Sequence, residues 1–446
     1  MEVLIENIIT YSFVALLAIG IIYFQLKMSK KKSKIIQGKI EKAKELGFHE
    51  PVSLHPVVNL DICIGSAACI KACPEHDILG ISEGKAATIN ASRCVGHGAC
   101  FHACPVGAIT LLIGTEKRGV DLPHISQEFE TNVKGIYIAG ELGGMGLIKN
   151  AVAQGKQAVD NIIKNLNKSP KAKFDIVIVG AGPAGISATL AAKEKNLRYL
   201  TLEQSSLGGT VFSFPRKKIV MTSPMHLPLY GKVKLTETSK PELLDLWNEV
   251  LQKNKITITE NQKVVSIEKF DDHFSVKTLA DTFTTNSVLL AIGRRGSPRK
   301  LGVPGEQLEK VAYRLIEPDL IHNQNVLIVG GGDSAIEAAL SLLDDKTNKV
   351  TLSYRGDSFA RIKPRNFENI NKAAKNNHLE IIYSSQVLEI KDKSVVFSFI
   401  KDGIMFEKEL VNDLVYIFAG GELPNEFLEK AGIRITKKFG EVILKH

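Results

Sequence analysis

The sequence predicts an α/β protein that also carries a small α+β domain and one N-terminal helix long enough to span a membrane. Three observations predict this. Two glycine-rich turns each follow an apolar, strand-like run and precede a helical run, six cysteines form a duplicated pattern, and residues 8–26 are almost wholly apolar. With 446 residues, 44% hydrophobic and 24% charged, the chain is long enough for several domains with cores of their own.

The net charge of +9 does not indicate a nucleic-acid partner. Much of the excess is local, because lysines crowd the run 27–34. A lysine-rich, solvated surface explains the remainder. We therefore expect no nucleic acid among the partners.

The N-terminal apolar stretch 8–26 has the length that a helix needs to cross a bilayer. Acidic residues (Glu2, Glu6) precede it and lysines follow it, which is the reverse of a secretory signal peptide. The positive-inside rule then predicts a single-pass protein of the cell membrane, with the N-terminus outside and the body in the cytoplasm. A buried core helix is the alternative. Residues 27–54 are expected to form a basic stalk near anionic lipid.

The cysteines form an internal duplication. Each of the second three lies 31 residues after its counterpart, and Gly65/Gly96 and Pro74/Pro105 repeat with them. We do not expect these cysteines to form disulfides in a reducing cytoplasm. Zinc binding is an alternative. Soft thiolates ending in Cys-Pro favour iron–sulfur clusters. The six residues are Cys63, Cys69, Cys73, Cys94, Cys100 and Cys104.

Residues 55–115 resemble a bacterial two-cluster ferredoxin, whose run is C-x2-C-x2-C-x3-C-P twice, with the fourth cysteine crossing to the other cluster. The resemblance implies one cluster on Cys63, Cys69 and Cys104 and another on Cys94, Cys100 and Cys73. The second cysteine of each run is replaced, by Ser66 and by His97. "CVGHGAC" also resembles the small ferredoxins that serve monooxygenases, which have histidine at this place.

Two clusters are therefore expected, each of the [4Fe-4S] or the [3Fe-4S] type. Three thiolates can hold a three-iron cluster, or a four-iron cluster whose last iron takes serine, histidine or water. His97 as a bystander beside the cluster is the alternative to ligation. A site one thiolate short carries less negative charge, so we expect its reduction potential to be shifted upward.

The segment "FDIVIVGAGPAGISATLAAKEKNLRYLTLEQ" predicts a first Rossmann-like dinucleotide-binding domain. Gly180 permits the tight turn, Gly182 lets a pyrophosphate approach the backbone and Gly185 lets helix and strand pack closely. Pro183 and Ala184 open the helix, whose N-terminus favours the pyrophosphate. Glu203, 23 residues after Gly180, is placed to bond a ribose hydroxyl.

A second such unit follows at "QNVLIVGGGDSAIEAALSLL". Its small residues are Gly330, Gly332 and Ala335, with Asp333 and Ser334 at the start of the helix. No acid ends the next strand, where Tyr354 and Arg355 stand, with Arg361 further on. Cations there favour the 2′-phosphate of NADP over the hydroxyl of NAD. Solvated surface arginines are the alternative, which leaves NAD open.

The two units in tandem resemble the two-dinucleotide flavoproteins that include thioredoxin reductase, within the pyridine nucleotide-disulfide oxidoreductase family. The resemblance covers about residues 174–440 and implies FAD on the first unit. Ala291 and Gly293 match the hinge strand between flavin and nicotinamide domains. Gly208, Gly209 and Thr210 match the loop over the flavin. The redox cysteine pair of thioredoxin reductase is absent, which excludes disulfide reduction by such a pair.

The element that closes the family's flavin domain, G-I-[FY]-x-A-G-[DE], stands ahead of the first glycine turn, as "GIYIAGE" within residues 131–162. We infer a circular permutation in which this segment folds back as the last strand and helix of the flavin domain. Gly140 then lies at the flavin, and Glu141 takes the ribityl role. The alternative is an independent strand and helix packed on the ferredoxin domain. Permutation at surface ends is physically tolerated.

The predicted domains follow from these motifs. They are a membrane anchor (1–26), a basic stalk (27–54), a two-cluster ferredoxin domain (55–115), the permuted closing segment (116–165), an FAD domain (172–300), an NAD(P) domain (301–425) and a return to the FAD domain (426–446).

The main functional hypothesis is a membrane-anchored NAD(P)H-dependent oxidoreductase that passes electrons between NADPH, FAD and two iron–sulfur clusters, as in a ferredoxin–NADP reductase. A flavin can take a hydride and release single electrons, which clusters accept one at a time. The alternatives are a flavin-dependent reductase of a small disulfide or quinone, and a redox sensor without turnover. The external donor or acceptor, a protein or a quinone, and the direction of electron flow stay open. A homodimer is expected from the resemblance. No catalytic acid–base residue stands out.

Overall fold

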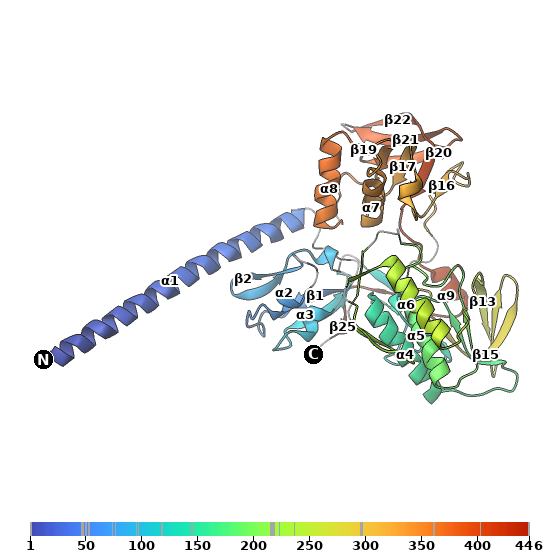
Figure 1. Ribbon diagram of the computed structural model, residues 1–446, viewed down its shortest axis with the longest axis horizontal. Helices are drawn as coiled ribbons and strands as arrows, with labels where there is room; N and C mark the ends of the chain where they lie inside the picture. The colour runs from blue at the N-terminus through green and yellow to red at the C-terminus, as the bar shows by residue number, and fades with distance from the viewer. Residues whose placement is uncertain are drawn as a thin grey trace. The chain divides into compact units, whose positions relative to one another are not determined.

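The computed structural model describes the chain apart from residues 1, 46–48, 50, 52–53, 74, 76, 95, 97, 117–118, 144–145, 215–218, 223, 236, 295–297, 360–361, 402 and 445–446. It divides into two compact units (Figure 1). The ferredoxin unit comprises Met1–Val120 and Lys438–His446, and the flavoprotein unit comprises Asp121–Lys437. The chain therefore passes from one unit to the other twice.

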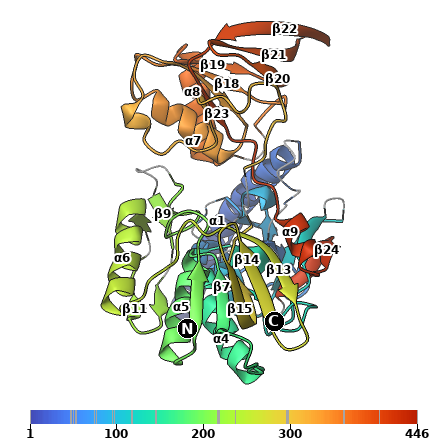
Figure 2. The ribbon, with the colours of Figure 1, turned by 90° about the vertical axis from the view of Figure 1, so that its right-hand side faces the viewer.

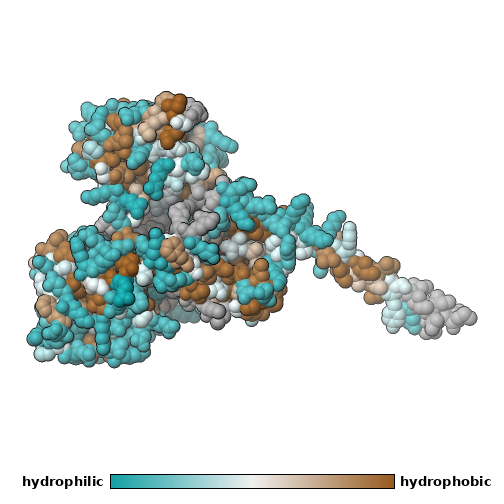
Figure 3. All heavy atoms as spheres, turned by 180° about the vertical axis from the view of Figure 1, so that it is seen from behind, coloured by the Kyte–Doolittle hydropathy of each residue, from teal (hydrophilic) through white to brown (hydrophobic). Residues whose placement is uncertain are grey.

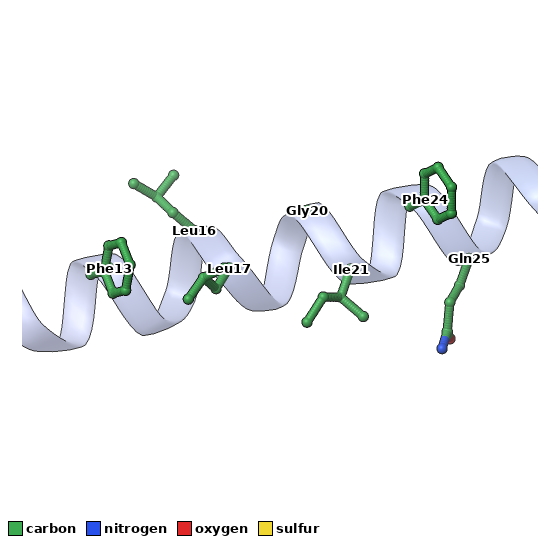
Figure 4. Close-up of a pocket in the computed structure, with 7 residues that line it drawn as sticks. All are labelled: Phe13, Leu16, Leu17, Gly20, Ile21, Phe24 and Gln25. Carbon is green, nitrogen blue, oxygen red and sulfur yellow. The ribbon is translucent and has the colours of Figure 1, made fainter.

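The N-terminal apolar stretch lies in a single helix, α1 (Glu2–Glu45). Among the described residues, one helix is long and apolar enough to cross a membrane, and α1 is that helix. Figure 4 shows side chains such as Leu17 and Ile21 projecting away from it. A shallow hollow on this surface is lined by α1 alone: Phe13, Leu16, Leu17, Gly20, Ile21, Phe24 and Gln25.

The sequence predicted a stalk over residues 27–54, and the structure differs from Ser33 onward. The last turns of α1 pack on the hairpin of β2 (Leu79–Ser82) and β3 (Lys85–Thr88). Gly80 accommodates the side chain of Ile36, because a Cβ atom on Gly80 would lie 2.8 Å from its Cδ1. Lys39 forms an ion pair of 2.6 Å with Asp77, and Ala43 is 2% exposed. This part of α1 therefore belongs to the ferredoxin unit.

The cysteine-bearing region repeats its backbone as well as its sequence. In the first half β1 (Leu54–Val58) precedes α2 (Ala68–Ala72), and in the second half β3 precedes α3 (Ala99–His102) and β4 (Ile109–Ile113). The antiparallel pairs β1–β4 and β2–β3 have corresponding registers: Leu54 faces Ile113, and Lys85, 31 residues after Leu54, faces Ser82. A one-turn helix η1 (Ala91–Arg93) precedes the second cysteine set.

The C-terminal strand β25 (Glu441–Leu444) also joins this unit, pairing antiparallel with β4 on the edge that β1 leaves free. The sequence assigned residues 426–446 to the flavin domain, so the last strand lies elsewhere than expected. Pairing satisfies the backbone groups of an otherwise open strand edge. The strand before it, β24 (Ile435–Lys438), pairs with β5 (Val120–Pro123), where the chain passes between units.

The first Rossmann-like lobe of the flavoprotein unit contains a six-stranded sheet (Figure 2). Parallel strands β7 (Phe174–Val179) and β8 (Tyr199–Leu202) lie beside the long β15 (Thr282–Leu290). The first half of β15 also pairs with β14 (Phe274–Thr278), which pairs with β13 (Val264–Lys269).

The remaining strand of this sheet is β6 (Ile136–Ile138), which comes before β7 in the chain and pairs parallel with the last half of β15. The helix after it, α4 (Ile148–Lys164), packs on α5 (Pro183–Glu194) over one face of the sheet. A one-turn helix η2 (Glu141–Gly143) connects β6 to α4. This arrangement is the circular permutation that the motif order predicts.

The two faces of the sheet follow the alternation of its strands. Ile176 and Ile178 pack with α4 and α5 on one face, whereas Val177 and Val179 pack on the other with β13, β14 and α9 (Asn425–Lys430). A further cluster around Trp247 of α6 (Lys240–Lys253) includes side chains from α4 and α5. Short strands precede α6: β9 (Ile219–Met221), β10 (Met225–Leu227), β11 (Gly231–Val233) and β12 (Glu237–Ser239).

The second Rossmann-like lobe has a five-stranded parallel sheet in the order β16–β23–β17–β18–β19. The strands are β16 (Val311–Ala312), β17 (Asn325–Val329), β18 (Lys349–Ser353), β19 (Leu379–Ile382) and β23 (Leu414–Ile417). One face packs with α7 (Asp333–Leu342) and α8 (Pro364–Lys375), and η3 (Pro318–Leu320) precedes β17. The other face packs with an antiparallel sheet of β20 (Ser385–Ile390), β21 (Ser394–Lys401) and β22 (Ile404–Val411).

Candidate functional site

Cysteines from both halves of the duplication line one small cavity in the ferredoxin unit. They are Cys63 and Cys69 from the first half of the duplication and Cys104 from the second. Ser66, at the position of the missing cysteine, lines the same cavity. The structure thus brings together the set that the crossed-over ferredoxin pattern predicts, along with apolar walls from Val58, Ala86 and Ile109.

The charges that act on Cys69, Cys94 and Cys100 come mainly from the same groups, although Cys69 also acts weakly on Cys100. Burial raises the pKa of Cys69, and the neighbouring Cys63 and Cys104 raise it further. Burial raises the pKa of Cys100 to about 12, with added repulsion from Cys94 and Cys73. Burial likewise raises the pKa of Cys94 to about 11, with added repulsion from Cys73. The members of the second predicted set, Cys73, Cys94 and Cys100, therefore also act on one another's charges.

Backbone amides point at the sulfur atoms of both sets. Ala86 N–H donates to Cys63 Sγ at 3.4 Å, Ala108 N–H to Cys104 Sγ at 3.2 Å, and Gly96 N–H to Cys94 Sγ at 3.4 Å. Such N–H···S bonds favour the thiolate form and raise the potential of an iron–sulfur cluster. The donor set therefore fits clusters of this class.

The loops between the cysteines need glycine at specific points. Gly65 has a φ of +68°, and a Cβ atom there would lie 1.9 Å from the carbonyl oxygen of Gly84. Its repeat counterpart Gly96 has a φ of +77°. The matching left-handed conformations show that the duplication preserves the local backbone that turns each loop around its sulfurs.

Ser66 and His97 are the two candidate cluster ligands that are not cysteines. Ser66 is exposed at the cavity, and its Oγ accepts from Ala68 N–H at 3.4 Å. His97 lies outside the described residues, as does Pro74. Among the described residues, no three His, Cys, Asp or Glu side chains lie close enough to bind one metal ion.

The first glycine turn has the geometry that a dinucleotide pyrophosphate requires. Gly180 has a φ of +104°, and a Cβ atom on Gly185 would lie 1.8 Å from its carbonyl oxygen, so helix and turn are in direct contact. A Cβ atom on Gly182 would have no neighbour within 4 Å, so this backbone faces open space at the N-terminus of α5. Pro183 and Ala184 form the first positions of α5. The residues fit the pyrophosphate of FAD.

Glu203 lies at the end of β8 and is 4% exposed. Its Oε2 accepts from Ala181 N–H at 2.7 Å and its Oε1 from Ser205 N–H at 3.0 Å. These bonds fix the carboxylate beside the glycine turn. Each oxygen keeps a lone pair that can accept from a ribose hydroxyl.

The predicted loop at Gly208, Gly209 and Thr210 lies against the same turn. Gly208 N–H donates to the carbonyl oxygen of Ala181 at 3.0 Å. A Cβ atom on Gly209 would lie 3.4 Å from Cα of Gly182. Both glycines have positive φ, +103° and +54°, so the loop can follow the turn closely.

The permuted segment and the hinge strand also meet here. Ala139 N–H donates to the carbonyl oxygen of Leu290 at 3.0 Å, next to Ala291, and Gly293 faces open space. Gly140, with φ of +89°, donates to Gln154 Oε1 at 2.8 Å, and Glu141 begins η2.

Sequence reasoning assigned no role to Arg294, which directly follows Gly293. Burial lowers the pKa of this guanidinium, while the charges of Glu141 and Asp121 raise it. A half-buried cation therefore lies near the predicted ribityl acid. The sequence marks Arg294 only by its position directly after the hinge glycine, since Glu141 and Asp121 lie far earlier in the chain.

The second glycine turn has similar geometry. Gly330 has a φ of +146°, Gly332 faces open space and Ala335 is fully buried. Asp333 at the start of α7 accepts from Lys363 N–H at 2.8 Å and from Asn366 Nδ2 at 2.7 Å, while Ser334 is exposed. The turn fits the pyrophosphate of a nicotinamide dinucleotide.

Of the two arginines predicted to favour NADP, the structure describes Arg355. Arg355 is exposed two residues after the end of β18, and Arg361 lies outside the described residues. The ring of Tyr354 lies against the turn, because a Cβ atom on Gly331 would come within 2.2 Å of it. Tyr354 also stacks on Phe359 with ring centroids 5.5 Å apart.

Comparison with known proteins gives two family matches. Residues 177–445 match the pyridine nucleotide-disulphide oxidoreductase family, and residues 55–105 match the 4Fe-4S dicluster domain. The bacilliredoxin reductase Bdr of Bacillus subtilis is 29% identical over 272 residues, covering 59% of this chain and 82% of that protein. A ferredoxin–NADP reductase of Acholeplasma laidlawii is 28% identical over 271 residues, covering 59% and 79%.

Among solved structures, the bacillithiol disulfide reductase Bdr of Staphylococcus aureus aligns with a TM-score of 0.52 at 24% identity, covering 61% of this chain and 88% of that one. The Bacillus cereus protein of the same name aligns with a TM-score of 0.53 at 22% identity, covering 61% and 85%. These two likenesses show the fold. The family match over residues 177–445 establishes that the chain belongs to the pyridine nucleotide-disulphide oxidoreductase family, and with the second match it identifies the chain as an NAD(P)H-dependent oxidoreductase with a 4Fe-4S dicluster domain.

Proposed function

We propose that this chain is a membrane-anchored oxidoreductase that passes electrons between NADPH, FAD and two iron–sulfur clusters. α1 is the anchor, with the N-terminus outside and both units in the cytoplasm. NADPH is the preferred coenzyme, and an acceptor or donor outside the chain completes the reaction.

The observation that carries the proposal is the double connection between the two units. The chain crosses after residue 120 and again after residue 437, and its last strand completes the ferredoxin sheet beside β4. A ferredoxin unit held at both ends stays at high local concentration around its flavoprotein partner. Two relatives of the flavoprotein unit are named ferredoxin–NADP reductase. This chain carries its own ferredoxin-like unit.

The cluster ligands follow from the cysteine groups. We assign one cluster to Cys63, Cys69 and Cys104, with Ser66 beside the remaining iron, and the other to Cys73, Cys94 and Cys100. His97 lies between Cys94 and Cys100 in the sequence, so we expect it at this second cluster. Each thiolate of such a cluster binds a different iron, so ligands spread around a cavity fit this group better than a single ion.

The dinucleotide-binding residues follow from the two glycine turns. We assign FAD to the turn at Gly182, with Glu203 at its ribose and Glu141 at its ribityl chain. NADPH is assigned to the turn at Gly332, with Arg355 near its 2′-phosphate. Bound FAD would supply the exchange between hydride transfer and single-electron transfer. The residues of the chain would hold both dinucleotides. They would neutralise the phosphate charges and accept hydrogen bonds from the hydroxyl groups.

A second candidate is reduction of a small disulfide by the flavin, with the clusters secondary. The similarity to proteins named bacilliredoxin reductase and bacillithiol disulfide reductase favours it. All six cysteines lie between residues 63 and 104, so the flavoprotein unit has no thiol of its own for such chemistry. The first proposal therefore remains the better supported.

Separate Cys69→Ala and Cys100→Ala variants distinguish the two. In the proposed function, reduction of a one-electron acceptor by NADPH falls at least tenfold in either variant, while bleaching of the flavin by NADPH persists. Lys71→Ala, an exposed change in α2, serves as the matched control and leaves both rates unchanged. Equal acceptor reduction in all three variants would contradict the proposal.

A further inference from the structure

Exposed apolar side chains lie at the cavity of Cys63, Cys69 and Cys104 and on the chain segments next to it. Leu60 is 54% exposed, Ile62 46% and Ile64 64%, and the side chains of Val57 and Val106 are also exposed. Ile64 and Val106 line the cavity itself. We call these five residues the apolar rim. Exposed apolar side chains are ordinary singly, but a group around one opening marks an interaction surface.

The rim is continuous because its two segments are bonded together. Asn59 N–H donates to the carbonyl oxygen of Ala108 at 2.8 Å, which joins the turn at residues 59–63 to the loop after Cys104. Cys63 N–H donates back to the carbonyl oxygen of Asn59 at 3.0 Å, which closes that turn. Leu60 and Ile62 therefore lie on a hydrogen-bonded turn that is joined to the loop carrying Val106.

Contacts with the β2–β3 turn place the rim near the start of the cytoplasmic part of α1. Ser33 Oγ accepts from Glu83 N–H at 2.9 Å. The next residue, Gly84, contacts Gly65, and the Nζ of Lys85 donates to the carbonyl oxygen of Leu60. Ser33 follows the end of the apolar stretch by seven residues, which is about 10 Å along a helix.

The other end of the hairpin lies further along α1. Asp77 pairs with Lys39, which is thirteen residues past the apolar stretch, or about 20 Å. Cys73 lies on this side, since its Sγ donates to the carbonyl oxygen of Glu75 at 3.1 Å. The two cysteine sets therefore lie at different distances from the apolar stretch, and the set with the apolar rim is nearer.

We propose that the apolar rim rests on the bilayer surface into which α1 is inserted. This inference rests on the proposed membrane anchoring. The polar headgroup region extends beyond the hydrocarbon by roughly 5–7 Å on each side. Ser33, which bonds to the β2–β3 turn, lies about 10 Å beyond the end of the apolar stretch, so the rim is expected at the outer edge of that region. Lysines of the 27–34 run attract anionic headgroups at the same level. Apolar side chains at this depth gain by leaving water.

The proposal gives the ferredoxin unit a defined orientation relative to the membrane. The cavity of Cys63, Cys69, Cys104 and Ser66 opens at the membrane, and the set of Cys73, Cys94 and Cys100 lies further from it. A lipid-dissolved partner would therefore meet the first set.

Photolabelling of the full chain in nanodiscs tests this surface. The nanodiscs contain phosphatidylcholine, phosphatidylglycerol and a phospholipid with a photoactivatable diazirine near its glycerol, and labelled residues are found by mass spectrometry. The expected result is labelling within residues 8–26 and within 57–64, with several-fold less at 39–45 of α1. Labelling at 8–26 with none above background at 57–64 would overturn the rim proposal and leave the anchor intact. Absence of labelling at both would overturn both.

Two double variants sharpen the test. Leu60→Ser with Ile62→Ser changes exposed side chains that do not line the cavity. It should reduce labelling of residues 57–64 at least threefold, with labelling of residues 8–26 unchanged. Ile404→Ser with Met405→Ser, at exposed apolar positions on β22, is the matched control and should change neither. Unchanged labelling of 57–64 in the rim variant would show that the apolar side chains of the rim do not hold this turn against the bilayer, and would overturn the proposal.

Discussion

Ile138 of β6 lies opposite Leu290 of β15 in a parallel pair, although Ile138 comes before the first glycine turn and Leu290 comes after it. The next amide, Ala139 N–H, continues the pairing with a 3.0 Å bond to the carbonyl oxygen of Leu290. The flavin lobe is therefore closed by a segment that the chain supplies first. The helix that follows β6, α4, then packs closely against α5.

Gly155→Ala should disturb that fit. A Cβ atom on Gly155 would lie 2.1 Å from the carbonyl oxygen of Ala184, so the variant must push α4 away from α5 at a cost of roughly 1–3 kcal/mol. We expect a lower thermal midpoint and faster loss of flavin, followed by fluorescence of released FAD. Gly38→Ala, in a helix with no neighbour within 4 Å, is the control and should not destabilise. Normal flavin retention by Gly155→Ala would argue against the permuted packing.

Arg355→Ala tests coenzyme choice. Arg355 is exposed after β18, where a cation favours the 2′-phosphate of NADPH. We expect the KM for NADPH to rise about tenfold, which corresponds to the loss of one charge-assisted hydrogen bond, while the KM for NADH stays constant. Lys372→Ala on α8 should alter neither. Equal changes in the KM for NADPH and the KM for NADH would contradict the assignment of Arg355 to the 2′-phosphate.

Ser66→Cys completes the missing position of the first cysteine run. Ser66 lines the cavity with Cys63, Cys69 and Cys104, so a new thiolate there can reach the same cluster. Added negative charge should lower the midpoint potential of one cluster and leave the other unchanged, as measured by a redox titration followed by electron paramagnetic resonance. Ser341→Cys on α7 is the control for an added thiol. Two unchanged potentials in Ser66→Cys would show that residue 66 lies away from the cluster.

Asp175 supports the first strand of the flavin lobe and is 1% exposed. Burial alone would raise the pKa of this carboxyl, but hydrogen bonds from the side chain and backbone of Arg198, at 2.8 and 3.0 Å, hold it below its usual value. A lowered folded-state pKa gives stability that is complete above the unfolded pKa of about 3.9 and is lost as the pH falls through the folded value.

Asp175→Asn should therefore cost roughly 1–3 kcal/mol of unfolding free energy at pH 7. The difference from the unmodified protein should shrink below pH 4, where the native carboxyl also becomes protonated. Unfolding followed by circular dichroism at pH 7 and pH 3 measures both values, with Asp281→Asn, an exposed site, as control. A pH-independent difference would mean that the charge of Asp175 does not matter.

Local patterns in the sequence predict the features that depend on neighbouring residues. The glycine turns at Gly180 and Gly330 are recognisable because each needs a left-handed backbone between a strand and a helix. The duplicated cysteine pattern resembles a two-cluster ferredoxin, and this resemblance implies both cysteine groups. The motif order predicts the permuted strand β6.

Features that depend on distant contacts were not predictable in the same way. The lysine-rich part of α1 has the helical spacing of a free stalk, and nothing local in it signals that Ile36 packs on Gly80. The pairing of β25 with β4 depends on an edge left open by residues far earlier in the chain. Arg294 likewise acquires its acidic neighbours Glu141 and Asp121 only through folding.

The central claim is that electrons pass between the flavoprotein unit and the six-cysteine unit. Its most direct test is electron paramagnetic resonance of anaerobically reconstituted full-length protein, frozen before and after addition of NADPH. Iron–sulfur signals that change on addition of NADPH in the unmodified protein, and fail to change in the Gly182→Val variant, are the predicted result. Protein that contains iron, sulfide and flavin, and whose flavin bleaches with NADPH while every iron–sulfur signal stays as it was, would contradict the account.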